Sequence, residues 1–183
     1  MSSAPAQLFV AVEDGTVYVR VVGRATYASS VDLKSLFESQ IGKGRREIAV
    51  DLRQCPLMDS TFIGLLAAFG MQLRPGPGSG ISLYCGNERI RGMLSNLGVN
   101  HLFIICEPDE DIPSHRTAQP AERGSTSHAE LQRTCLEAHR KLMEINPENV
   151  ARFKDVARFL AEDLKKAESG SDQNMDGDHS QPA

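Results

Sequence analysis

One stretch of the chain, EIAVDLRQCPLMDSTFIGLLAAFG (residues 47–70), constrains the fold more than any other. It begins with an apolar segment typical of a strand, passes through a short polar turn, and continues into a strongly apolar helical segment that opens at Asp59-Ser60-Thr61. This order places two hydroxyls and a carboxylate at a helix N-terminus. Backbone N–H groups are unpaired there and the helix dipole is positive, so the position tolerates an oxyanion or a phosphate.

The segments around this stretch predict an α/β domain. Two alternating segments, Gln7–Val12 and Thr16–Val22, flank Asp14-Gly15, which is typical of a β-hairpin. Further strands are expected over residues 47–52, 81–85 and 101–106, and helices over residues 29–41, 60–73 and 87–97. Because helices and strands then alternate, we expect a mixed β-sheet whose later strands are parallel and are covered by helices.

The composition changes after residue 108. We predict an α/β domain over residues 1–108, a linker over 109–126, a helical hairpin over 127–168 and a disordered tail over 169–183. The hairpin's apolar seam includes Leu131, Leu142, Phe153 and Leu160. Two short helices bury too little surface to be stable alone, so the seam should dock on the main domain or on a second copy of the chain.

Composition excludes several classes of protein. The net charge is −4 and there is no Trp, and no basic stripe with interleaved aromatic residues is present, which disfavours nucleic-acid binding. No apolar run approaches the ~20 residues that span a bilayer, and the N-terminus does not resemble a secretory signal. The four cysteines form no C-x-x-C pair and are expected to be reduced thiols of a cytoplasmic protein.

The residues themselves leave several kinds of chemistry open at Asp59-Ser60-Thr61. The simplest is a helix cap and nothing more. A hydrolase using Ser60 with His101 would need an orienting group and an oxyanion hole, neither of which the sequence reveals. Asp172-x-Asn174-x-Asp176-Gly177 opens like a calcium loop, but Ala183 stands where its closing glutamate belongs. We therefore expect no enzyme activity, no metal and no cofactor.

The segment DLRQCPLMDSTFIGLL resembles the signature of the STAS domain of bacterial anti-sigma-factor antagonists. The matching positions are Asp51, Met58, Asp59, Ser60, Thr61, Gly64 and Leu65. The order of elements over residues 7–106 also agrees with that family, whereas the hairpin lies outside the resemblance. One departure is Phe62, which stands where the family usually has a glycine.

The resemblance implies a phosphorylation switch. In the family, the serine after the aspartate is phosphorylated by an anti-sigma factor that is a serine kinase, and a phosphatase reverses the modification. Carried over, the phosphorylation site is Ser60, and whether Thr61 is also modified stays open. The unmodified chain would bind the anti-sigma factor and so release a sigma factor for transcription. The expected partner contacts are Asp59, Ser60, Thr61, Phe62, Ile63 and Leu66.

Two further alternatives remain at this point. The chain could be a scaffold subunit of the same fold in a signalling or lipid-transport assembly, in which Ser60 and Thr61 only cap the helix. The hairpin could also form a homodimer.

Overall fold

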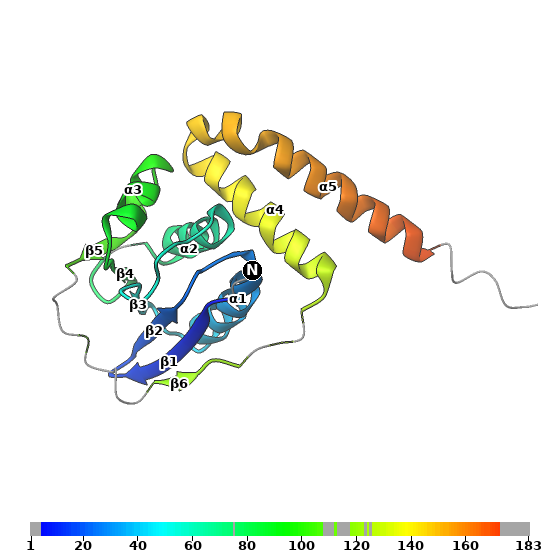
Figure 1. Ribbon diagram of the computed structural model, residues 1–183. Coiled ribbons are helices and arrows are strands. Elements are labelled where there is room, and N and C mark those ends of the chain that lie inside the picture. Colours follow the sequence, from blue (N-terminus) through cyan, green and yellow to red (C-terminus); the bar gives the residue numbers. More distant parts are fainter. Residues whose placement is uncertain are drawn as a thin grey trace, which may run out of the picture.

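The computed structural model describes residues 5–74, 76–107, 112, 118–122, 124 and 126–172 (Figure 1). The strands are β1 (Gln7–Glu13), β2 (Thr16–Val22), β3 (Glu47–Asp51), β4 (Gly80–Tyr84), β5 (Ile104–Cys106) and β6 (Gln119–Pro120). The helices are α1 (Tyr27–Gly42), α2 (Ser60–Leu73), α3 (Glu88–Asn96), α4 (His128–Ile145) and α5 (Val150–Asp172), with short 3₁₀ turns η1 (Asn100–Leu102) and η2 (Pro147–Asn149).

The strands form one mixed sheet in the order β5-β4-β3-β2-β1-β6. The predicted hairpin is confirmed, because β1 pairs antiparallel with β2 and Glu13 lies opposite Thr16. Its two turn residues, Asp14 and Gly15, have φ values of 49° and 86°, the left-handed conformation that a tight hairpin turn requires. Strands β2 to β5 are parallel, as the alternation of helices and strands predicts.

Helices α1, α2 and α3 pack against one face of the sheet. Each joins two neighbouring parallel strands in the same direction across the sheet, and right-handed crossovers place such helices on the same side. The core between the two layers contains Val17, Val19 and Val21 of β2 together with Phe37 of α1 and Ile90 of α3. The architecture is therefore α/β, as predicted.

Described residues of the segment predicted as a linker contact the sheet at two places. Strand β6 pairs antiparallel with β1, at the edge of the sheet opposite to β5. Ile112 is only 5% exposed and borders a small cavity with Tyr18 and Arg20. Strand β6 was not predicted, because its two residues, Gln119 and Pro120, carry no strand pattern of their own.

Helices α4 and α5 form the expected antiparallel hairpin, and α4 packs on α1 and α2 as a third layer (Figure 1). Side chains cap the two helices: the Ser127 side chain accepts from the Glu130 N–H, and the Asn146 side chain accepts from the Glu148 N–H. The packing of α4 on α1 and α2 confirms that the hairpin docks on the α/β part of the chain. Helix α5 continues to Asp172, four residues into the predicted tail, and residues 173–183 lie outside the described part of the chain.

The prediction of a single apolar seam was incomplete, because α4 has two apolar sides. Leu142 is completely buried in the main core. A separate cluster joins Leu136 of α4 to Ala157 and Leu164 of α5. A helix with two apolar sides can be sandwiched between two partners, here α2 and α5.

The predicted length of the last strand of the α/β part was wrong. The strand predicted over residues 101–106 is limited to Ile104–Cys106, and His101 lies in the 3₁₀ turn η1 that precedes it. Among the helices of the described residues, none combines the length and the apolar character needed to cross a membrane.

Candidate functional site

The turn between β3 and α2 is held by contacts on both sides. The Asp59 N–H donates to the carbonyl of Ala25 at 2.9 Å, and the Leu52 N–H donates to the carbonyl of Tyr84 at 3.0 Å. Met58, directly before Asp59, is completely buried. These contacts fix the place at which α2 begins, and Ser60 is the first residue of that helix.

Asp59 caps two helices at once. Its Oδ1 accepts from the Phe62 N–H of α2 at 2.9 Å, and its Oδ2 accepts from the Tyr27 N–H of α1 at 2.7 Å. Both N–H groups belong to first helical turns, where the backbone leaves donors unpaired. The sequence predicts the first cap, but it gives no sign of the second, which joins residues far apart in the chain.

We expect Asp59→Ala to lower the free energy of unfolding by about 2 kcal/mol, because one cap is worth about 0.5–2 kcal/mol and this one serves two helices. Asp59→Asn keeps one acceptor oxygen and should cost less. Urea unfolding followed by circular dichroism measures both. An alanine variant as stable as the wild-type protein would contradict the double cap.

Ser60 is half-buried and its hydroxyl contacts α4. Its Oγ lies 2.9 Å from Nε2 of His139, within hydrogen-bonding distance. The His139 ring is 6% exposed and packs against Phe153 of α5, with the ring centroids 4.9 Å apart. Burial lowers the pKa of His139, while the carbonyl of Cys135 and the charge of Asp59 act in the opposite direction. The histidine is therefore favoured in its neutral form, which can either accept from Ser60 or donate to it.

Thr61 lies deeper, at 4% exposure. Its Oγ1 donates to Sγ of Cys135 on α4 at 3.5 Å. Burial raises the pKa of the Cys135 thiol, so the group stays protonated near neutral pH. Thr61 is thus much less accessible than Ser60.

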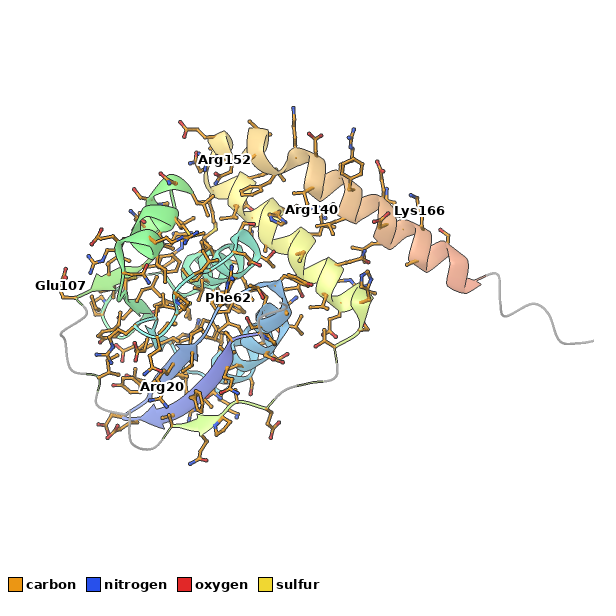
Figure 2. All side chains as sticks on the ribbon, in the orientation of Figure 1. Arg20, Phe62, Glu107, Arg140, Arg152 and Lys166 are labelled. Carbon is orange, nitrogen blue, oxygen red and sulfur yellow. The ribbon has the colours of Figure 1, made fainter. Side chains whose placement is uncertain are left out.

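The apolar residues expected to contact a partner are inside the molecule. Phe62, Ile63 and Leu66 are each 0% exposed. Figure 2 shows Phe62 in the interior, below the α4–α5 hairpin. As partner contacts these residues stay a prediction, and in this conformation they belong to the core.

Helix α4 crosses α2 at close range. A Cβ atom built on Gly64 would lie 2.6 Å from the Ala138 carbonyl oxygen, so only a residue without a side chain fits there. The sequence predicts α2 to be apolar nearly all round, which requires a cover on its outer side. It does not identify α4 as that cover, and His139 is therefore a site residue that sequence reasoning missed.

The structure does not bring Ser60 and His101 together. His101 borders a cavity with Gly70, Met71 and Arg74 at the other end of α2. His139 instead contacts Ser60, but its Nδ1 lacks a well-formed hydrogen bond within the described part of the chain. In a catalytic serine–histidine pair, a third group orients the histidine through this second ring nitrogen.

Metal ligands do not gather around this site. Among the described residues, no group of three or more His, Cys, Asp or Glu side chains could hold a metal ion. The four cysteines are free thiols. The half calcium loop lies at and beyond the last described residue, Asp172, and so falls outside the side chains that the structure describes.

Neither a scan against protein-family models nor a search of curated proteins returned a match to this chain.

Proposed function

We propose that the chain is a STAS-type regulator of transcription, an anti-sigma-factor antagonist switched by phosphorylation of Ser60. Its partners would be an anti-sigma factor with serine-kinase activity and a phosphatase. In this proposal the chain is the substrate of a kinase and not itself an enzyme. The resemblance of residues 51–66 to the family signature motivates it.

The observation that carries the proposal is the position of Ser60. It is the first residue of α2, directly after the capping residue Asp59, and it is half-buried. A helix N-terminus accommodates a phosphate through its unpaired N–H groups and its dipole, so the modification need not unfold the helix.

The size of the expected effect is sufficient for a switch. A phosphate adds about −1.5 to −2 charges at pH 7, and desolvating them in an apolar interface without a cation opposes association. A coupling of ~3 kcal/mol would weaken a complex ~100-fold. The unmodified chain would therefore bind its anti-sigma factor, and the phosphorylated chain would release it.

A non-switching scaffold of the same fold is the second candidate. Complete burial of Phe62, Ile63 and Leu66 favours it, because these side chains support the fold without needing a partner. In a scaffold, Ser60 and Thr61 would only cap α2.

Mass spectrometry separates the two candidates. We expect the chain purified from its own cells to carry one phosphate, and Ser60→Ala to remove it. Ser95→Ala, at an exposed serine of α3, is the matched control and should leave the phosphate in place. Thr61→Val tests the second hydroxyl in the same way. A chain that never carries phosphate would favour the scaffold.

A further inference from the structure

The contacts of α4 suggest how the proposed switch is regulated. We propose that the α4–α5 hairpin is an intramolecular cover of α2, which must move away before Ser60 can be phosphorylated or a partner can bind. This inference rests on the proposed function for its biological meaning, but the cover itself can be tested separately.

Helix α4 covers the first two turns of α2 with a continuous set of contacts. His139 contacts the Ser60 hydroxyl at 2.9 Å, and Cys135 accepts from Thr61 at 3.5 Å. Between them, Ala138 is 1% exposed and lies against Gly64. The face that a partner of α2 would need is therefore already occupied by the chain's own helix.

A phosphate on Ser60 does not fit beneath this cover. The modification replaces the hydroxyl hydrogen with a phosphoryl group that carries three further oxygens. His139 Nε2 is already at hydrogen-bonding distance from Oγ, and the ring is held from behind by Phe153. Ser60 is half-buried, and on its buried side the space is filled by this ring, so a phosphoryl group cannot enter there without a shift of α4. Docked α4 and phosphorylated Ser60 should therefore exclude each other.

The contacts within the α4–α5 hairpin would let both helices move away from α2 together. The cluster of Leu136, Ala157 and Leu164 joins α4 to α5 and does not involve the main domain. At the α3 end, the hairpin is held by polar contacts: Asn149 Nδ2 donates to the Leu97 carbonyl at 3.0 Å, and Arg152 donates to the Asn96 carbonyl at 2.9 Å. Leu142 is buried in the main core, and Ile145 and Phe153 pack against that core. Opening would break these contacts but preserve the sheet.

A reversible lock tests the cover in the full chain. Thr61→Cys places a second thiol next to Cys135, so that oxidation can tie α4 to α2 and reduction can free it. We expect native-state hydrogen exchange of the α4 amides in the reduced variant to run about tenfold faster than that of the β3 and β4 amides, since local opening precedes global unfolding. Oxidation should abolish this difference. Equal exchange in both redox forms would overturn the cover.

Access to Ser60 is tested with a release variant. Ala138→Glu places a bulky charge against Gly64 and should raise the fraction of chains phosphorylated at Ser60 several-fold. Ala151→Glu makes the same change at an exposed position of α5 and should behave like the wild-type chain. Two results together would overturn the proposal that the cover controls access to Ser60. The Ala138→Glu and Ala151→Glu variants would be phosphorylated equally, and so would the oxidised and reduced forms of Thr61→Cys.

The two proposals fail in different ways. If no variant carries phosphate, the proposed function fails, and the hydrogen-exchange result alone decides whether the hairpin is a cover. If Ser60 is phosphorylated equally with and without the lock, the proposed function stands, and the proposal that the hairpin controls access to Ser60 is wrong.

Discussion

Gly64→Ala will destabilise the protein, although alanine is the better helix former. The added Cβ would lie 2.6 Å from the Ala138 carbonyl oxygen and 3.0 Å from the Ala138 Cβ, so α4 must shift away from α2. Overpacking of this kind costs about 1–3 kcal/mol, and it outweighs the gain of up to about 1 kcal/mol that alanine brings to a helix interior. Urea unfolding midpoints measure the difference.

Gly92→Ala is the matched control for this substitution. Gly92 also lies inside a helix, α3, but nothing lies within 4 Å of the position that its Cβ would take. The same change should therefore stabilise the chain by about 0.5–1 kcal/mol. If both variants gained stability, the close crossing of α2 and α4 would be wrong.

Asn149→Asp should also lower the free energy of unfolding strongly, because Asn149 anchors the turn between α4 and α5. Asn149 is completely buried, and its amide donates to the carbonyls of Leu97 and Leu142, each at 3.0 Å. A carboxylate has no proton to donate and would face both oxygens with a negative charge. We expect a loss of about 3 kcal/mol or more at pH 7, measured by chemical unfolding, because a buried charge is left without a partner.

Two comparisons make this result specific. Lowering the pH should restore part of the stability of Asn149→Asp, since burial raises the pKa of the new carboxyl and the protonated form can donate one hydrogen bond. Asn146→Asp, three residues earlier, should be nearly neutral, because Asn146 acts as an acceptor for the Glu148 N–H and aspartate caps as well as asparagine. Equal losses in both variants would contradict the anchoring role of Asn149.

Local signals predicted most of the elements. Asp14-Gly15 marked the hairpin, and the apolar run after Asp59 predicted α2 with the bounds that the structure has. Features that depend on distant parts of the chain were missed. Strand β6 forms only because β1 offers a free edge, and the two apolar sides of α4 overlap in its sequence pattern.

The site was predicted only on the side that comes from α2. Asp59 and Ser60 follow from capping rules, because their roles depend on residues close in sequence. His139 is 79 residues away from Ser60, and no spacing rule connects them. The fully apolar character of α2 was the one signal that something covers it, but it does not tell which segment does so.

The short connection between β6 and α4 determines how tightly a partner protein must bind α2 in order to displace α4. Strand β6 pairs with β1 and ends at Pro120, and α4 begins at His128, so residues 121–127 alone tether the released hairpin. A tether of this length keeps the hairpin at an effective concentration of the order of millimolar. A partner protein at micromolar concentration would be about a thousandfold more dilute than the tethered hairpin. To occupy α2 in half of the molecules, it would need an affinity for α2 about a thousandfold higher than that of α4.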